Sequence, residues 1–130
     1  MRFFFDNDIS PRVVCAIKCI ANGDPEVTAL REMFEQATPD RVWIPEVTKR
    51  GWIIVSRDFR QRRNRAEHQT LRTSGARAIY IRQRGNQEDL YSLAGRIISM
   101  WPKLIDWGET AKPGELAQLN SKNVVELLKS

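Results

Sequence analysis

Short apolar runs alternate along the chain with longer segments in which apolar residues recur every three or four positions. The runs at 2–5, 52–56 and 76–81 are nearly continuous, which is typical of strands buried on both faces of a parallel sheet. The segments 10–21 and 87–105 have the helical period. Strands alternating with helices predict an α/β fold, a three-layer α/β/α sandwich with a mainly parallel central sheet.

Capping residues place the starts of two helices. Ser10 is a good N-cap and Pro11 suits the first helical position, so we expect a helix to about residue 21. Thr38 has the same relation to the segment that follows it. Pro45 should break or kink that second helix, which we expect to end at Gly51.

Two intermediate segments are more ambiguous. Residues 26–30 read as a short second strand, and 31–36 could equally form a helical turn. The polar, arginine-rich segment 61–73 predicts a helix that stops near Gly75.

The C-terminal part of the chain predicts an extension of the main domain. We expect a domain over 1–107 and an extension over 108–130 packed on the same domain. Within the extension, 115–119 and 123–128 are separated by turn residues and predict a hairpin. A final helix from Val124 is the alternative.

Length and composition favour one soluble domain. The chain has 130 residues, 42% of them hydrophobic, enough for a single core. We find no apolar run long enough for a membrane span and no signal-peptide pattern, so a cytoplasmic protein without membrane contact is expected. Cys15 and Cys19 lie one helical turn apart and are expected to pack in the core without forming a disulfide. The single histidine, His68, is expected on the surface.

The positive charge is concentrated in one segment. Residues 57–84 contain nine arginines and two acids, a local net charge of +7, although the whole chain carries +5. Arginine forms bidentate contacts with phosphate, so the segment predicts contact with nucleic acid, and a solvated helix face is the alternative. The candidates are Arg57, Arg60, Arg62, Arg63, Arg65, Arg82 and Arg84.

Acidic residues follow two of the predicted central strands. Asp6 ends the first strand and Asp58 follows the strand at 52–56, and parallel strands bring such ends to the same edge of a sheet. Asp40 lies in the first turn of the second helix, where it would also favour the helix dipole. Asp8 is a further candidate, or flanks the helix after Ser10. Converging carboxylates require a cation, and Mg²⁺ or Mn²⁺ prefers such ligands.

Other catalytic chemistries lack the residues they need. A single histidine excludes a histidine-pair ribonuclease mechanism, and we find no serine or cysteine with a credible base beside it. The chain also has no glycine-rich phosphate loop. Catalysis, if present, would depend on carboxylates and a metal ion that activates water at a phosphodiester.

The acids and the residues around them resemble a known family. Asp6 after an apolar first strand is similar to the first acid of PIN-domain ribonucleases. The run Thr38-Pro39-Asp40-Arg41-Val42-Trp43-Ile44-Pro45-Glu46, followed by Arg50-Gly51-Trp52-Ile53-Ile54-Val55-Ser56-Arg57-Asp58, resembles PIN-like proteins of the VapC toxin branch. The resemblance covers about residues 2–82.

This resemblance implies a metal-dependent endoribonuclease that uses Mg²⁺ or Mn²⁺ to hydrolyse RNA. Its members are commonly toxins, often homodimeric, and each is held inactive by a cognate antitoxin protein. Asp6, Asp40 and Asp58 match the metal-binding and catalytic acids of the family. A fourth acid is usual, for which Asp8 and Asp89 are the candidates.

Two other functions are compatible with parts of the pattern. A catalytically silent PIN-like module that binds nucleic acid or an antitoxin would keep the fold and the basic segment. A phosphoacceptor receiver domain also has acids after its first strand and an aspartate after its third. It requires a lysine after a later strand, whereas this chain has no lysine between Lys49 and Lys103.

Overall fold

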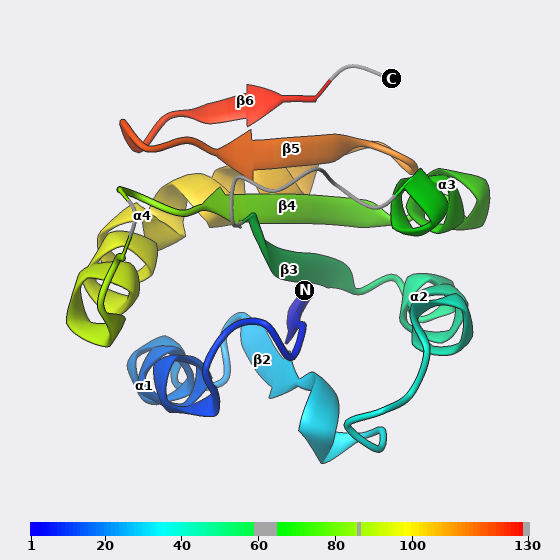
Figure 1. The fold of residues 1–130 in the computed structure, drawn as a ribbon, viewed down its shortest axis with the longest axis horizontal. Helices are drawn as coiled ribbons and strands as arrows, with labels where there is room; N and C mark the ends of the chain where they lie inside the picture. The colour runs from blue at the N-terminus through cyan, green and yellow to red at the C-terminus, as the bar shows by residue number, and fades with distance from the viewer. Residues whose placement is uncertain (59–64, 86, 129–130) are drawn as a thin grey trace.

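The computed structural model describes residues 1–58, 65–85 and 87–128, with the backbone alone described for residues 58, 65, 66 and 68. Helices flank a central sheet on both sides (Figure 1). The elements in chain order are β1 (Arg2–Phe5), α1 (Pro11–Ala21), β2 (Glu26–Ala29), the 3₁₀ turn η1 (Leu30–Glu32), α2 (Asp40–Lys49), β3 (Ile53–Asp58), α3 (Arg65–Ser74), β4 (Arg77–Arg82), α4 (Leu90–Thr110), β5 (Leu116–Leu119) and β6 (Val125–Leu127).

The sheet is mostly parallel, which confirms the predicted fold class. Its strand order is β2-β1-β3-β4-β5-β6. The first five strands pair in parallel, and β6 pairs antiparallel with β5. From β1 the chain proceeds to β2 on one side and then returns to β3 on the other. Sheets of this kind open a crevice at the carboxyl ends of the two strands where the order reverses.

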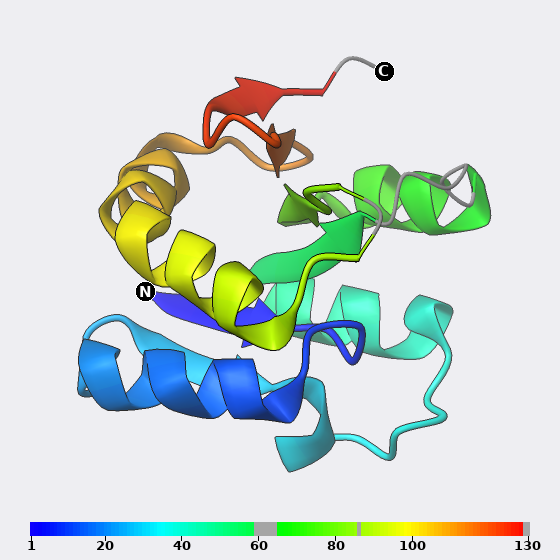
Figure 2. The same cartoon turned by 60° about the vertical axis from the view of Figure 1, so that its left-hand side comes forward.

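The three aromatic residues of β1 explain how the layers are held together. Phe3 and Phe5 point to the face covered by α1 and α4, where the Trp101 ring lies 4.8 Å from Phe3. Phe4 points to the opposite face, covered by α2 and α3, and packs 5.4 Å from the Trp43 ring. Figure 2 shows the sheet between the two helix pairs. A strand buried on both faces therefore needs apolar residues at every position.

The predicted N-cap is confirmed for α1 and is wrong for α2. Ser10 caps α1 as predicted, and its Oγ accepts a hydrogen bond from Arg12 N at 3.2 Å. The prediction of Thr38 as the cap of α2 was wrong, because Pro39 occupies that position and contributes no side-chain hydrogen bond. The proline fixes an extended backbone there, so Asp40 becomes the first helical residue.

The helix α2 also continues through Pro45 to Lys49, although a break was one expected outcome. A proline in a helix removes one backbone hydrogen bond. The buried residues Trp43, Ile44 and Val47 lie on both sides of Pro45 in sequence and pack against the sheet. Their burial outweighs the missing bond.

The helix α4 begins and ends later than the predicted range 87–105. Asp89 caps it, accepting a hydrogen bond from Ser92 N at 2.7 Å. The helix continues past Pro102 because Trp107 and Gly108 extend its buried face. A Cβ at Gly108 would lie 2.7 Å from Ile53 Cδ1, so any larger residue would require the Ile53 side chain to shift.

The C-terminal residues form the predicted hairpin, and the alternative of a final helix is wrong. β5 continues the parallel sheet beside β4, and β6 folds back on β5. The division of the chain at residue 107 stays a prediction. Among the described residues, no helix combines the length and apolar composition that a membrane span requires.

The two cysteines are exposed, which corrects the prediction that they pack in the core. The buried face of α1 consists of Val13, Val14 and Ile17. Cys15 and Cys19 lie on a different part of the helix surface. The side chain of His68 is outside the described part of the chain, so its predicted surface position is not tested.

Candidate functional site

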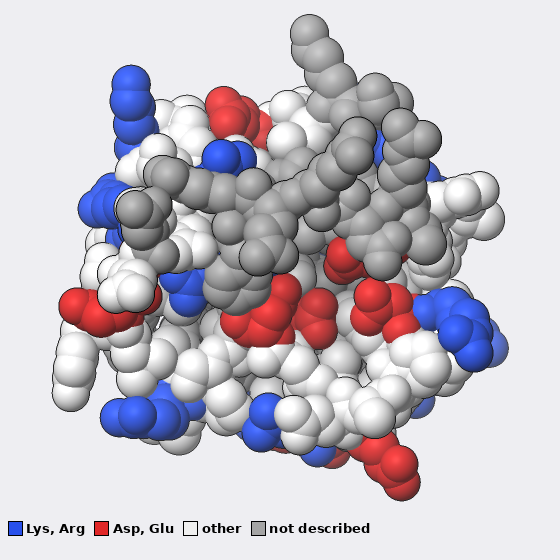
Figure 3. Space-filling model, in the orientation of Figure 1, with Lys and Arg blue, Asp and Glu red and all other residues white. Residues whose placement is uncertain are grey.

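Acidic side chains gather where the strand order reverses. Asp6 directly follows β1, and Ser56 lies near the carboxyl end of the neighbouring strand β3. The Asp6 amide donates a hydrogen bond to Val55 O at 2.9 Å, which keeps Asp6 aligned with β3 beyond the last paired residue of β1. Figure 3 shows one face of the molecule, with several red acidic groups near its centre and with Lys and Arg mostly nearer its margin.

Asp6 and Asp8, here called the acid pair, meet at one serine. The Ser56 Oγ lies 3.1 Å from Asp6 Oδ2 and 2.9 Å from Asp8 Oδ2. Ser56 is only 3% exposed, so this contact is shielded from water. A hydroxyl has one proton and can donate it to only one carboxylate at a time. The second carboxylate is therefore left without that bond.

The remaining oxygens of the acid pair differ in their partners. Asp6 Oδ1 accepts a hydrogen bond from Asn7 N at 2.6 Å. The Arg57 backbone amide donates to the Asp8 carboxylate. Asp8 Oδ1 is buried and has no hydrogen-bond partner among the residues that the structure describes. A buried oxygen left in this way costs free energy unless a cation or proton reaches it.

Burial and mutual repulsion make both acids hard to ionise. Burial and, after it, the nearby Asp6 charge raise the pKa of Asp8 to about 7, against the hydrogen bonds from Arg57 and Ser56, which lower it. Burial likewise raises the pKa of Asp6, and the Asp40 charge also raises it. Perturbed carboxylates at a strand edge are a common feature of functional sites. A divalent cation would reverse both shifts.

Two further acids act on this pair through their charge. Asp40 is exposed at the start of α2, where its Oδ1 accepts a hydrogen bond from Trp43 Nε1 at 3.1 Å. Glu67, in the first turn of α3, raises the pKa of Asp8. Sequence reasoning missed Glu67, because an acid in the first turn of an arginine-rich helix also has the ordinary role of favouring the helix dipole.

The two other predicted acids have different environments. Asp58 is the last residue of β3, in register with Arg82 of β4, but its side chain lies outside the described part of the structure. Asp89 is exposed and uses Oδ1 to cap α4. Asp8 is therefore the candidate for the fourth acid that the geometry favours over Asp89.

The described acidic residues have the oxygen ligands that a hard cation prefers, but they do not by themselves form a complete metal site. Within the residues that the structure describes, no three acidic, histidine or cysteine side chains form a group that could hold a metal ion. The buried oxygen of Asp8 without a partner and the raised pKa values of the pair nevertheless indicate unsatisfied negative charge. Carboxylate oxygens are the ligands that Mg²⁺ and Mn²⁺ prefer. The donor set therefore fits such an ion.

The predicted RNA-contacting arginines have varied surroundings. Arg57 has an 11% exposed side chain and forms an ion pair with Glu88. Arg82 is half-buried, and Arg84 is exposed with its Nε donating to Ser121 O at 3.0 Å. Arg60, Arg62 and Arg63 lie outside the described residues, as does the side chain of Arg65. Contact of these residues with RNA stays a prediction.

Comparison with known proteins gives one match. Residues 1–83 match the family model described as "PIN like domain". The matched range includes the acid pair, Asp40, Asp58 and Glu67. No curated protein and no solved structure matches the chain.

Proposed function

The chain belongs to the PIN-like domain family, and from this membership and the acid pair on Ser56 we propose that it is a metal-dependent endoribonuclease. The observation that carries the proposal is the juxtaposition of Asp6 and Asp8 at the carboxyl edge, with a buried oxygen of Asp8 left without a partner. Two partly buried carboxylates that share one hydroxyl need a proton or a cation to offset their charge. A nuclease site explains their position.

In this proposal Asp6, Asp40 and Asp58 hold the metal ion, and Asp8 is the fourth acid. A bound Mg²⁺ or Mn²⁺ supplies an activated water and offsets the charge that develops on a phosphodiester. Ser56 orients the carboxylates of the acid pair through its hydroxyl. Arg84 is an exposed arginine just after β4 and would contact the RNA backbone, together with the predicted Arg60, Arg62, Arg63 and Arg65.

The proposal extends to the biological role that the VapC-branch resemblance implies. The chain would be the toxin of a toxin–antitoxin pair, inhibited by a cognate antitoxin protein, and could act as a homodimer in the cytoplasm. The support for this role is the run of residues from Thr38 to Asp58 that resembles that branch. Purification of the chain with and without its genomic neighbour, followed by an RNA cleavage assay, tests the inhibition.

The enzymatic claim is tested by cleavage of a mixed RNA pool with Mn²⁺ or with a chelator. We expect cleavage with Mn²⁺ alone, and a loss of about a hundredfold or more in Asp6→Asn and Asp58→Asn, because each removes charge directly at the site. Asp106→Asn, an exposed aspartate of α4, is the matched control and should cleave like the wild type. Cleavage that survives both site variants would refute the assignment.

A catalytically silent binding module is the second candidate. The observation that favours it is that no three potential ligands among the described residues stand together. Such a module would bind RNA or an antitoxin without cleavage, and its RNA affinity would not depend on Mn²⁺ or on Asp6. The same assay separates the two functions when RNA binding is measured beside cleavage.

A further inference from the structure

Beside the acid pair lies a second cluster of buried charges, in which Glu88 and Arg96, from beyond the part of the chain that matches the family, meet Arg57 from within it. The Arg96 side chain of α4 is 4% exposed, and its Nη1 lies 2.8 Å from Glu88 Oε1 and 3.0 Å from Glu88 Oε2. Glu88, whose side chain is 1% exposed, also accepts a hydrogen bond from Arg57 Nη2 at 3.2 Å. These side chains connect α4 to the end of β3.

The same arginine ties down the C-terminal hairpin. Arg96 Nε donates to Asn123 Oδ1 at 3.0 Å, and Arg96 Nη2 donates to Asn120 O at the same distance. Its Nη1 also donates to Arg82 O, at the end of β4. We call Arg57, Glu88, Arg96, Asn120 and Asn123 the Arg96 network. One guanidinium therefore holds the ends of adjacent strands and the turn between β5 and β6.

The network reaches the candidate site through Arg57. The Arg57 side chain is held by Glu88, while its backbone amide donates to the Asp8 carboxylate. The next residue is Asp58, the last of β3. The orientation of this strand end thus determines the position of the Arg57 amide relative to Asp8. It also determines the backbone position of Asp58. Loss of the contact between Arg57 and Glu88 would therefore move the Arg57 amide and Asp58.

We propose that Arg96 is a positioning residue of the candidate site. It acts on the site through Glu88 and Arg57, and the C-terminal hairpin in turn holds Arg96 in place. The proposal rests on the proposed function for its catalytic consequence. Partners that orient a metal site from outside it typically contribute tenfold to a hundredfold in metal affinity or activity. The hairpin would therefore be part of the functional unit, although it lies beyond residue 83.

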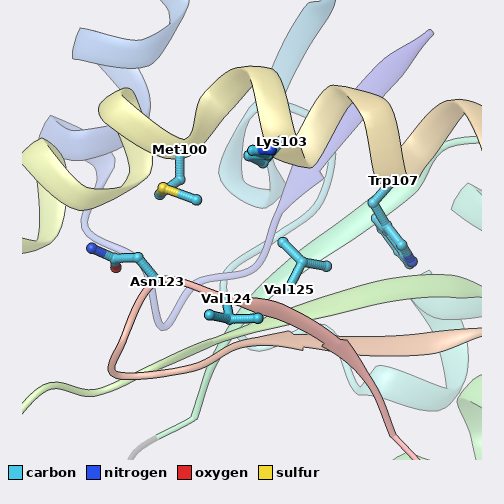
Figure 4. A pocket seen from close by; sticks show the side chains of 6 residues that line it. All are labelled: Met100, Lys103, Trp107, Asn123, Val124 and Val125. Atoms are coloured by element: carbon cyan, nitrogen blue, oxygen red, sulfur yellow. The ribbon is translucent and has the colours of Figure 1, made fainter.

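Asn123 allows a mild test of this support. It has a left-handed backbone with φ of 60°, a conformation that glycine adopts without strain. Its side chain lines a hollow of about 380 Å³ between α4 and β6, shown with Met100, Lys103 and Trp107 in Figure 4. Because this hollow is open, Asn123→Gly removes the Arg96 contact without creating a sealed cavity. Asn22→Gly is the matched control, since Asn22 also has a left-handed backbone and caps α1.

The experiment measures hydrogen exchange of the Arg57 amide by NMR in metal-free protein. We expect about tenfold faster exchange in Asn123→Gly than in the wild type, with no change in Asn22→Gly and with unchanged exchange in α2. Glu88→Gln, which keeps the shape but removes the charge, should give a larger increase if it folds. Equal exchange of the Arg57 amide in wild type and Asn123→Gly would overturn the proposal.

RNA cleavage provides the functional readout. In Asn123→Gly we expect kcat to fall roughly tenfold with KM for RNA unchanged, because the altered contacts face the acids and not the substrate. A change in KM alone would contradict a positioning role. If the wild type neither binds Mn²⁺ nor cleaves RNA, the proposed nuclease function fails, and the exchange measurement alone decides whether Arg96 positions the end of β3.

Discussion

The acid pair and the Arg96 network are two clusters of buried charge at the same edge of the sheet, and they are compensated in opposite ways. In the network, burial alone would raise the pKa of Glu88, but hydrogen bonds from the Arg84 amide and Arg96, together with the Arg96 charge, lower it below its ordinary value. In the acid pair, burial and repulsion raise the pKa of Asp8 to about 7. In the first cluster opposite charges offset one another, and in the second two carboxylates repel each other.

This contrast separates structural from functional charge within one chain. A buried ion pair whose opposite charges offset one another contributes to a fixed structure, and removal of one partner leaves the other uncompensated. Two neighbouring carboxylates whose pKa values are both raised are, by contrast, a common feature of functional sites. The comparison therefore supports a functional role for Asp6 and Asp8 on physical grounds that do not depend on the family match.

The largest expected effect comes from breaking the Arg96 network. Glu88→Ala leaves Arg96 and Arg57 without their shared carboxylate, and we expect a loss of about 3–5 kcal/mol in the free energy of unfolding. Urea denaturation measures it. Glu46→Ala is the control, because Glu46 pairs with Arg50 on the exposed surface of α2, where such a pair contributes less than about 1 kcal/mol. Equal losses in the two variants would contradict the contrast.

The opposite sign is expected in the acid pair. Asp8→Asn removes the charge whose burial and repulsion raise this pKa, so metal-free protein should become more stable, by up to about 4 kcal/mol at pH 8. The raised pKa means that the folded state holds its proton more tightly than the unfolded state. Wild-type stability should therefore fall as pH rises from 3.8 to about 7. The gain from Asp8→Asn should disappear below pH 4, which thermal unfolding in chelator at several pH values can check.

The network should show the reverse pH dependence. The lowered pKa of Glu88 means that its stabilising contribution is present above its ordinary value of 4.5 and is lost as the pH falls through the lower folded-state value. Comparing the acid limb of unfolding in wild type and Glu88→Gln isolates this contribution. A wild-type acid limb identical to that of Glu88→Gln would be inconsistent with a stabilising ionised Glu88.

A smaller effect is expected at Ser56. Ser56→Ala removes the hydroxyl between Asp6 and Asp8 and should cost about 1 kcal/mol in the free energy of unfolding. In the Asp8→Asn background the carboxylate repulsion is already absent, so the cost should change measurably. A double-mutant cycle gives this coupling. Strict additivity would indicate that the serine does not link the two acids.

The sequence predicted the strands and the edge at which the acids meet, because a strand buried on both faces leaves a clear apolar run and parallel strands end together. It could not show that Asp6 and Asp8 share Ser56, since this contact joins residues far apart in the chain. Asp89 could not be distinguished from Asp8 as the fourth acid until its capping bond to α4 was visible.

The Arg96 network could not be predicted from the sequence either. Arg96 lies on an apolar helix, where a single arginine reads as an exposed charge, and Glu88 lies in a loop. Their burial depends on the hairpin at Asn120 and Asn123 closing over them. The end of α4 was misjudged for a related reason, because the packing of Trp107 and Gly108 carries the helix past Pro102.

The most direct test of the central claim is calorimetric titration of purified protein with Mn²⁺, in wild type and in Asp6→Asn, Asp8→Asn and Asp106→Asn. If the acid pair forms part of a metal site, wild type and Asp106→Asn will bind Mn²⁺ with the same affinity, and both acid-pair variants will bind at least about tenfold more weakly while remaining folded. Equal Mn²⁺ affinity in all four proteins, or no binding to the wild type, would contradict the account.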